Sequence, residues 1–406
     1  MKTALVFTVL IACLIQEGRA NEACSPLSEP DFRAPGRRLS EESRSTTDAG
    51  VALVRSILEA WERSQNVLGV FCDLSKAFDC VDHHTLLLKL SHYGVKGTAV
   101  KLIQSYLSSR IQTVEVNGVR SSGSHVEMGV PQGSILGPFL FLVYINDLPF
   151  FVENLCEIVL FADDTSLLFN VDRRKNNYDD VNNALSQVLQ WFNVNNLKIN
   201  ANKTKCIKFS LPNVKVEHIE IKLNNNKLDL VDSTTFLGIT IDSKLQWNHH
   251  ITLLAGKLSS AAYAIRKIRQ LTDTETARTV YFSYFHSILS YGIILWGTAA
   301  DIESIFILQK RAVRSIYQLS SRTSLREKFK EIGILTVASQ FIYNCILLVK
   351  NNINLYTKNS NVHNFNTRNR NKLALPPYRL QKVYRSFMGQ GIHFYIKFLM
   401  PFLSYP

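Results

Sequence analysis

The first part of the chain has two kinds of apolar pattern, a helical repeat and a continuous apolar run. Residues 51–61 repeat apolar side chains at helical spacing, which predicts an amphipathic helix that begins near 45–48 with a Thr or Asp cap. The continuous apolar run 67–72 predicts a short buried strand. Further elements are predicted as helices at 85–92 and 97–109, a hairpin at 113–120 with an Asn117-Gly118 turn, and an apolar helix that follows the Gly/Pro-rich loop 128–138 and ends near 148.

The next stretch predicts mainly strands. In residues 157–168 two apolar runs flank adjacent aspartates, which predicts a hairpin with its turn at Asp163 and Asp164. A helix is predicted at 178–195, a loop and strand at 197–209, and short strands at 219–223, 227–231 and 235–241. Strands, helices and a hairpin in this order are typical of an α+β layer.

After residue 247 the pattern becomes helical. Helices are predicted at 251–268, 274–291, 302–317 and 335–349, with Lys and Arg interspersed, whereas the sequence from 351 has no long periodicity. The predicted organisation is a signal-like segment 1–20, a linker 21–44, an α+β domain 45–243, a helical region 244–350 and a basic tail 351–406.

Charge is unevenly distributed along the chain. The formal net charge is +13, and 46% of the residues are hydrophobic, which is enough for a substantial core. From residue 244 to the end there are 22 Lys and Arg but only six Asp and Glu, and no acid follows Glu331. Such a region suits a polyanion such as nucleic acid, although a solubilising basic surface would have the same composition.

The N-terminus and the cysteines predict different compartments. Lys2, an apolar run over 4–15 and the small residues around Ala20 are typical of a secretory signal peptide, whose apolar core is too short to span a membrane. The seven cysteines are scattered and have no zinc-binding spacing, as expected of free thiols in an intracellular protein. They occupy positions 13, 24, 72, 80, 156, 206 and 345.

Three carboxylates stand at positions suited to chemistry. Asp73 ends the predicted strand 67–72, and Asp163 with Asp164 occupies the predicted hairpin turn. Alone, Asp73 would equally suit a helix cap, and the aspartate pair could be a solvated turn. If the two strands are neighbours, the three carboxylates converge, and carboxylate oxygens are the ligands that Mg²⁺ prefers. Two such ions can activate a 3′-hydroxyl and stabilise a leaving pyrophosphate.

Five ordered motifs carry a family resemblance. The chain resembles the reverse transcriptase of non-LTR retrotransposons, of the jockey-like kind, over about residues 45–406. The motifs that match, in the family's order A to E, are Asp73-Leu-Ser-Lys-Ala-Phe-Asp79, Met128-Gly-Val-Pro-Gln-Gly-Ser-Ile-Leu-Gly-Pro138, Phe161-Ala-Asp-Asp164, Leu197-Lys-Ile-Asn-Ala-Asn-Lys-Thr204 and Phe236-Leu-Gly238.

The resemblance implies a polymerase palm, with a mixed or antiparallel sheet and packed helices, followed by an α-helical thumb. It implies an RNA-directed DNA polymerase that adds dNTPs to a DNA primer on an RNA template, with no membrane partner. Asp73, Asp163 and Asp164, with the backbone carbonyl of Leu74, would hold two Mg²⁺ ions, for which Mn²⁺ could substitute.

For the incoming nucleotide, the resemblance implies three positions. Phe78 would exclude a ribose 2′-hydroxyl, and Gln132 with the Gly133 backbone would line the dNTP site. The alternatives are an ordinary core phenylalanine and a solvated loop glutamine.

The remaining roles concern the leaving group and the primer. Lys203 would protonate or neutralise the departing pyrophosphate, with Lys205 as a competitor and a solvated lysine as the alternative. Phe236, Leu237 and Gly238 would hold the primer end, or else form a plain core strand. The basic helices after Trp247 would track the template–primer backbone.

The chain also departs from the family pattern. The fingers region expected before motif A, with its cationic clamp on the triphosphate, and the endonuclease domain are not recognised, so we expect a truncated element with weak or absent polymerase activity. Two alternative functions stay open: an inactive nucleic-acid-binding relic and a secreted chimeric protein that reuses the palm. The family implies the nucleus or cytoplasm as the compartment. The signal-like segment conflicts with this, and a chimeric gene model would explain the conflict.

Overall fold

A computed structural model describes residues 45–174, 178–212, 220–223, 226–362, 364–365 and 368–399. The predicted signal peptide 1–20 and linker 21–44 lie outside the described residues. Within the described ranges, none of the helices is both long enough and apolar enough to cross a membrane.

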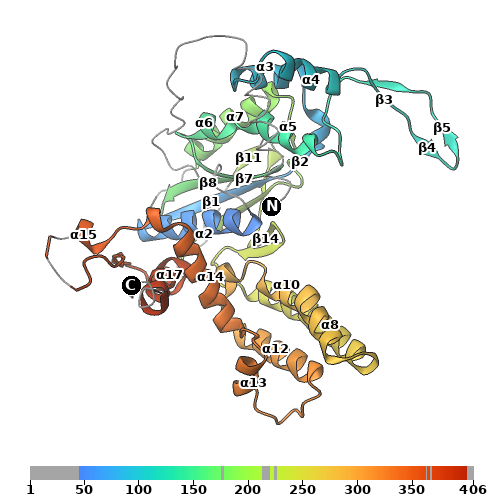
Figure 1. The fold of residues 1–406 in the computed structure, drawn as a ribbon. Helices are drawn as coiled ribbons and strands as arrows, with labels where there is room; N and C mark the ends of the chain where they lie inside the picture. Colours follow the sequence, from blue (N-terminus) through green and yellow to red (C-terminus); the bar gives the residue numbers. More distant parts are fainter. Residues whose placement is uncertain are drawn as a thin grey trace, which may run out of the picture.

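A five-stranded sheet forms the centre of the N-terminal part (Figure 1). Its strand order is β13 (Asp229–Leu230), β10 (Lys205–Phe209), β1 (Gln65–Cys72), β8 (Asp164–Asp172) and β7 (Glu157–Phe161). All neighbours are antiparallel except β10 and β13, which are parallel, so the sheet is mixed. β1 is buried from Asn66 to Cys72 because helices cover both faces of the sheet, which explains its continuous apolar sequence.

Helices pack on the two faces of this sheet. On one face lies α2 (Thr46–Glu62), whose apolar side chains join Val67, Phe71 and Phe209 in one core. Its cap is Ser45, not the predicted Thr or Asp, and the Ser45 hydroxyl accepts a hydrogen bond from the Asp48 amide at 3.2 Å. The other face is covered by α5 (Leu136–Ile145), α6 (Leu148–Val152) and α7 (Asp179–Val194), which pack on Leu68 and Val70.

A long excursion separates β1 from α5. It contains α3 (His83–His92), α4 (Thr98–Leu107) and a ribbon that projects from the body (Figure 1), made of β3 (Arg110–Gln112), β4 (Glu115–Val116), β5 (Val119–Arg120) and β6 (Ser124–Val126). The predicted turn at Asn117-Gly118 is confirmed, with φ of 52° and 79°. Asp82 caps α3 by accepting from the Thr85 amide at 2.7 Å, so Asp73 is not the cap.

The predicted strand 235–241 is wrong in its topology. The segment forms a hairpin of β14 (Ser233–Phe236) and β15 (Ile239–Asp242), in which Phe236 pairs with Ile239. The chain turns because Leu237 and Gly238 both adopt positive φ, 46° and 79°. The predicted strand 227–231 is divided between β12 (Asn226–Lys227), which pairs with β11 (Lys222–Leu223), and β13. The start of the predicted strand 219–223 lies outside the described residues.

The helical region that follows is confirmed, and one of its predicted helices is divided. Its main helices are α8 (Asn248–Leu271), α12 (Ile302–Ile316) and α14 (Val337–Asn351). The predicted helix 274–291 divides into α9 (Thr274–Val280), a π-helical segment η2 (Tyr281–His286) and α10 (Ser287–Ser290). Short α11 (Ile293–Trp296) and α13 (Arg326–Glu331) complete the group.

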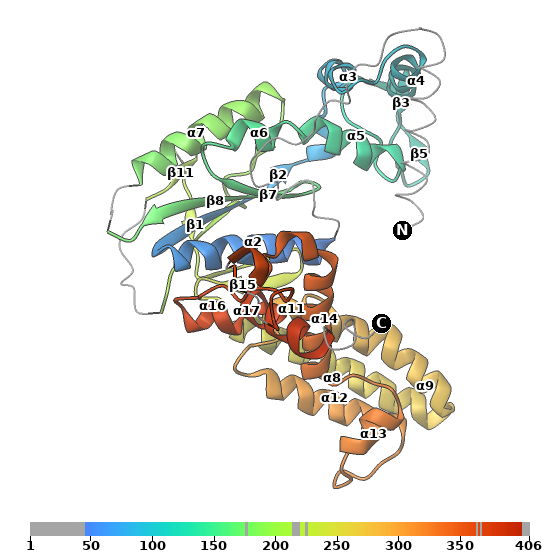
Figure 2. The same ribbon diagram turned by 60° about the vertical axis from the view of Figure 1, so that its left-hand side comes forward.

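The sequence after residue 351 is not simply a tail, because its last part returns to the sheet domain. α16 (Gln381–Arg385), α17 (Phe387–Phe394) and η4 (Tyr395–Leu399) lie beside α2 and α14 (Figure 2). The Arg379 guanidinium donates to the Trp61 carbonyl at 2.5 Å and to the Glu62 carbonyl at 3.2 Å, and so caps the end of α2. These helices escaped the sequence analysis because each is too short to show a period.

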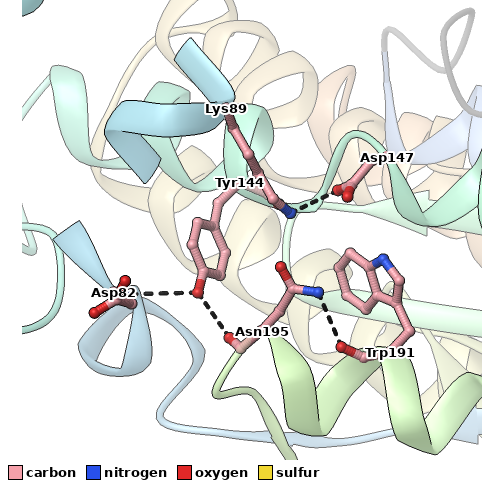
Figure 3. Close-up of polar contacts among 6 residues, drawn as sticks. All are labelled: Asp82, Lys89, Tyr144, Asp147, Trp191 and Asn195. Atoms are coloured by element: carbon pink, nitrogen blue, oxygen red, sulfur yellow. Dashed lines mark hydrogen bonds and ion pairs between the residues drawn. The ribbon is translucent and has the colours of Figure 1, made fainter. Parts of the chain in front are cut away.

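Buried polar contacts fix the excursion to the sheet domain (Figure 3). The Tyr144 hydroxyl of α5 donates to the Asn195 carbonyl at the end of α7 at 2.7 Å. It also accepts a hydrogen bond from the Asp82 amide at 3.4 Å. Tyr144 is fully buried, and burial raises the pKa of its hydroxyl to about 12. One hydroxyl therefore joins three segments that are distant in sequence.

Lys89 reinforces this junction from α3. Its ammonium donates to the Tyr144 carbonyl and to the Asp147 carboxylate, both at 2.7 Å, and lies 5.0 Å from the centre of the Trp191 ring. Burial lowers the pKa of Lys89, and the hydrogen bond and charge of Asp147 oppose that shift. The cation is therefore held by partners on both α5 and α7.

We expect Tyr144→Phe to lower the free energy of unfolding by about 1–3 kcal/mol, because the Asp82 amide and the Asn195 carbonyl lose their shared partner inside the core. Urea unfolding followed by circular dichroism measures the change, with an unchanged m-value. Tyr263→Phe, at a tyrosine that is 61% exposed on α8, is the control. Equal stability of the two variants would contradict the role given to the Tyr144 hydroxyl.

Candidate active site

The pairing of β1 with β8 places two aspartates opposite each other. The last pair of the ladder is Cys72 with Thr165, and one further step of the same antiparallel register sets Asp73 opposite Asp164. Side chains directly across an antiparallel pair have Cβ atoms about 4.5–5.5 Å apart. Desolvation and the neighbouring carboxylates of Asp163 and Asp73 raise the pKa of Asp164, as expected for acids that share one site.

The turn of this hairpin lies one residue earlier than predicted. Phe161 pairs with Asp164, so Ala162 and Asp163 form the two-residue loop and Asp164 begins β8. Two-residue loops are the commonest hairpin connections, and Ala162 provides the positive φ, 54°, that such turns require. Asp163 is therefore at the exposed tip, next to the facing pair Asp73 and Asp164.

The carboxylates lie on the face of the sheet that carries the β14–β15 hairpin. Side chains alternate along a strand, so Asp73 shares a face with Phe71 rather than with Cys72. The Phe71 ring lies 5.9 Å from the ring of Phe236, the last residue of β14. The motif E hairpin therefore packs against the face of β1 to which Asp73 belongs.

The loop at 200–204 holds the backbone of Asp73 on both sides. The Asp73 amide donates to the Thr204 hydroxyl at 3.3 Å, and the Asp73 carbonyl accepts from the Asn200 amide at 2.8 Å. Thr204 is fully buried, and its hydroxyl donates in turn to the Asn200 carbonyl at 2.9 Å. Sequence reasoning did not identify Asn200 and Thr204 as positioning residues, although the Asn-Ala-Asn-Lys-Thr sequence is a turn signal.

The same loop places Lys203 beside Asp73. The Asn200 side chain accepts hydrogen bonds from the amides of Asn202 and Lys203, and the Lys203 ammonium lies 3.9 Å from the Asp73 carboxylate. The Lys203 side chain is 69% exposed, which leaves it free to move toward a ligand. Lys205, the competing candidate, bonds instead to Asp229 at 2.8 Å.

Leu74 and Phe78 follow Asp73 in a short, packed segment. Leu74 is buried in β2 (Leu74–Ser75), which pairs with β9 (Lys198–Ile199). Phe78 lies in the 3₁₀ helix η1 (Ala77–Cys80), half-buried, with its ring 4.7 Å from the Phe141 ring of α5. The structure therefore fixes the orientation of Phe78 from behind and leaves one side of it accessible.

The Gly/Pro-rich loop docks on the segment that carries Phe78. The Val130 amide donates to the Phe78 carbonyl at 2.8 Å, and the Gln132 amide group donates to the Asp79 carboxylate at 3.0 Å. Gly129 has φ of 86°, and an added Cβ would lie 2.9 Å from the Asp79 backbone, so only glycine fits. Gly133 also has positive φ, 77°, and faces open space.

Within this loop, Ser134 lies one residue before Ile135, the N-cap position of α5. The Ser134 hydroxyl accepts a hydrogen bond from the Gly137 amide at 2.9 Å and donates to the Pro131 carbonyl at 2.7 Å. The first turn of α5 is therefore tied to the loop that carries Gln132.

Phe236, Leu237 and Gly238 lie at the turn of the β14–β15 hairpin. Phe236 is buried, whereas the Leu237 carbonyl at the tip accepts a hydrogen bond from the Tyr291 hydroxyl at 2.5 Å. Tyr291 follows α10 and was not among the predicted site residues, because only the fold brings the helical region to this turn. The contact links the hairpin to the helices that follow it.

The described residues contain no ready-made metal-binding group of three or more His, Cys, Asp or Glu side chains. The chemistry of the donor set nonetheless fits a hard divalent cation. Asp73, Asp163 and Asp164 lie at one end of the sheet, and desolvation together with the charges of Asp163 and Asp73 raises the pKa of Asp164. A cation with oxygen ligands would relieve the repulsion between these charges.

Comparison with known proteins agrees with these motifs. A family model described as reverse transcriptase (RNA-dependent DNA polymerase) matches residues 34–241, about half of the chain. The chain is 30% identical over 292 residues to the probable RNA-directed DNA polymerase from transposon BS of Drosophila melanogaster, which covers 68% of this chain and 32% of that relative. It is also 30% identical over 276 residues to the RNA-directed DNA polymerase from mobile element jockey of Drosophila melanogaster. This alignment covers 65% of this chain and 30% of that relative.

The chain thus spans about a third of the length of these curated relatives. Among solved structures, telomerase from Candida albicans in complex with a fragment of telomeric RNA aligns with a TM-score of 0.36 and 14% identity, over 80% of this chain and 56% of its own.

Desolvation of Asp164 and repulsion by the carboxylates of Asp163 and Asp73 predict a pH-dependent gain in stability for Asp164→Asn. The folded-state pKa of Asp164 is raised, so the folded protein is penalised once pH rises through that pKa, and the penalty is absent below the unfolded value of about 3.9. We expect the variant to have a higher urea midpoint than the unmodified chain at pH 7, and the gap to close as the pH falls toward about 4.

Asp232→Asn, at an exposed carboxylate outside the turn, is the matched control and should give no such gap. A stability difference for Asp164→Asn that stays constant between these pH values would contradict the raised pKa of Asp164.

Proposed function

The chain belongs to the reverse transcriptase family, among the jockey-like non-LTR elements, and from this premise we propose that it is an RNA-directed DNA polymerase. The reaction is transfer of a deoxynucleotide from a dNTP to the 3′-hydroxyl of a DNA primer on an RNA template. The observation that carries the proposal is the register that sets Asp73 opposite Asp164, beside Asp163 and Lys203.

Asp73, Asp163 and Asp164 are proposed to hold two Mg²⁺ ions, with the Leu74 carbonyl as a further ligand and Mn²⁺ as a substitute. When bound, the metal supplies Lewis-acid activation of the primer hydroxyl and charge neutralisation at the pyrophosphate. The protein's own contribution is to hold the Asp73 backbone through Asn200 and Thr204, so that the carboxylate stays aimed at the sheet edge.

Lys203 is proposed to act on the leaving group. Its ammonium lies 3.9 Å from the Asp73 carboxylate and is largely exposed, so it can turn to a pyrophosphate oxygen next to the same carboxylate. At that oxygen it neutralises negative charge and can deliver a proton. Lys205 is held by Asp229 and is not assigned this role.

The nucleotide side of the site is proposed to be formed by Phe78, Gln132 and Gly133. Phe78 is braced by Phe141, so its accessible side would meet the sugar of the nucleotide and reject a 2′-hydroxyl. Gln132 is tied to Asp79, and the loop backbone at Gly133 can approach a ligand closely because no side chain intervenes.

The primer end is proposed to rest on the hairpin turn at Phe236, Leu237 and Gly238. The Tyr291 contact braces this turn from the helical region, whose Lys and Arg side chains would follow the phosphate backbone of the template and primer. We propose the nucleus or cytoplasm as the site of action, since the RNA template is found there.

Primer extension on poly(rA)·oligo(dT) with Mg²⁺ or Mn²⁺ tests the proposed activity. We expect weak but measurable incorporation by the full chain and a loss of about a thousandfold or more in the Asp163→Ala/Asp164→Ala variant, because several kcal/mol of charge stabilisation disappear. Asp172→Ala removes a carboxylate at the opposite end of β8 and should keep activity. Equal incorporation by the double variant and the unmodified chain would remove the polymerase assignment.

The two lysines of the motif D loop give a second test. Lys203→Ala should reduce the rate of single-nucleotide addition by about a hundredfold and flatten its dependence on pH at the alkaline end, because a proton donor is lost. Lys205→Ala, which breaks only an exposed pair with Asp229, should stay within about threefold. Rapid-quench measurement of one addition separates these outcomes, and a larger effect from Lys205 would reverse the assignment.

A further inference from the structure

A cavity of about 720 Å³ lies between the start of α8 and the C-terminal helices α16 and α17. Its polar lining comes from Gln246 and Asn248 on one side and from Gln381, Arg385 and Gln390 on the other. Trp247, Phe341 and Phe394 contribute apolar wall. These residues take no part in the proposed polymerase reaction.

Most of the polar side chains in this cavity are free to bind a ligand. Gln246, Asn248, Gln381 and Arg385 are exposed, and within the described part of the chain their side chains make no hydrogen bond or ion pair. The Gln390 amide donates to the Tyr384 carbonyl at 3.3 Å and keeps its oxygen available. The cavity therefore offers several amide donors and acceptors around one guanidinium.

The charge around the cavity has one sign. None of its lining residues is acidic. The closest acid along the chain is Asp242, whose carboxylate accepts hydrogen bonds from the backbone amides of Lys244, Gln246 and Trp247. After Glu331 the sequence has nine Lys and Arg and no acid. An anion would thus be attracted to this region without an opposing carboxylate in the cavity wall.

The positively charged side chains near the cavity make different contacts. Lys382 donates to the Lys244 carbonyl and lies 5.5 Å from the centre of the Trp61 ring, and Arg379 caps α2. These two hold α16 against the sheet domain. Arg385 has no such duty and faces the cavity, so it is the guanidinium that can meet a phosphate.

The cavity is distant from the carboxylates. Lys382 lies on Trp61, and the Trp61 indole donates to the Phe209 carbonyl, opposite Val67 near the start of β1. Asp73 follows the other end of this eight-residue strand. At a rise of about 3.3 Å per residue, the two sites are roughly 20 Å apart along the sheet.

We propose that this cavity binds a single-stranded nucleic acid, with a backbone phosphate on Arg385 and the edge of an unpaired base among the amides of Gln246, Asn248 and Gln381. A single strand is required because the Watson–Crick edges of the bases in a duplex are already paired, whereas these edges are free in a single strand and can meet the amide donors and acceptors. The site goes beyond the proposed polymerase function, since it needs neither a dNTP nor a primer end.

Fluorescence anisotropy with 5′-fluorescein-labelled U12 RNA and T12 DNA tests the site, on the full chain with excess unlabelled template–primer duplex to occupy the proposed carboxylate site. Arg385→Glu should weaken binding by about fivefold or more and reduce the slope of log K against log salt by about 0.7 or more, as expected when one phosphate contact is lost. The oligonucleotide that shows this Arg385-dependent binding more strongly identifies the preferred strand.

Lys397→Glu is the matched control, because it makes the same charge change at an exposed residue outside the cavity. Its effect should stay within about twofold, since it alters only the general field. Asn248→Leu removes an amide without changing charge, and it should weaken binding with an unchanged salt slope.

Crosslinking with 4-thiouridine in the same RNA gives an independent readout, with the label expected on peptides that contain 246–248 or 381–390. The inference is overturned if Arg385→Glu and Lys397→Glu bind alike, or if crosslinks occur only around Asp73, Asp163 and Asp164. Primer extension by the same variants keeps the two proposals separate: active variants with unaltered RNA binding would remove this site and leave the polymerase assignment intact.

Discussion

The antiparallel register of β1 against β8 is the constraint on which the candidate site depends. Cys72 pairs with Thr165, and the next step sets Asp73 opposite Asp164 on the face shared with Phe71. Because side chains alternate along a strand, a slip of one residue would send the two carboxylates to different faces and exchange buried for exposed positions. Burial of β1 on both faces, by α2 and by the helices α5 to α7, makes such a slip costly, so the core itself fixes the geometry of the acids.

Around this pair the fold uses backbone contacts more than side-chain packing. The loop at 200–204 grips the amide and carbonyl of Asp73 and presents Lys203, while the Gly129 loop lies so close to Asp79 that a Cβ cannot fit. The acids repel one another, and this repulsion is tolerable at an exposed end of the sheet. A divalent cation bound by the three carboxylates would offset the repulsion. The Tyr291 hydroxyl, from the helical region, donates to the Leu237 carbonyl at the hairpin turn. The helical region therefore contacts the sheet domain at this turn.

Much of this arrangement could be predicted from the sequence, where the signal was local. The apolar run of β1, the Asp163-Asp164 hairpin, the Asn117-Gly118 turn and most long helices have clear periods or turn residues. The two misplaced turns share one physical cause, since positive φ at Ala162 and Leu237 carries no strong residue signature and is imposed by strand pairing. Tyr291 and Thr204 gain their roles only through contacts across 54 and 131 residues of sequence, and the helices at 381–399 are too short to show a period.

Anomalous diffraction from crystals of the full chain grown with Mn²⁺ is the most direct test of the central claim, that the β1–β8 register builds a divalent-cation site. The account predicts an anomalous peak about 2.0–2.3 Å from oxygens of Asp73 and of Asp163 or Asp164. A structure in which the Asp73 carboxylate lies more than about 10 Å from both of the other two, or in which manganese binds only elsewhere, would contradict it.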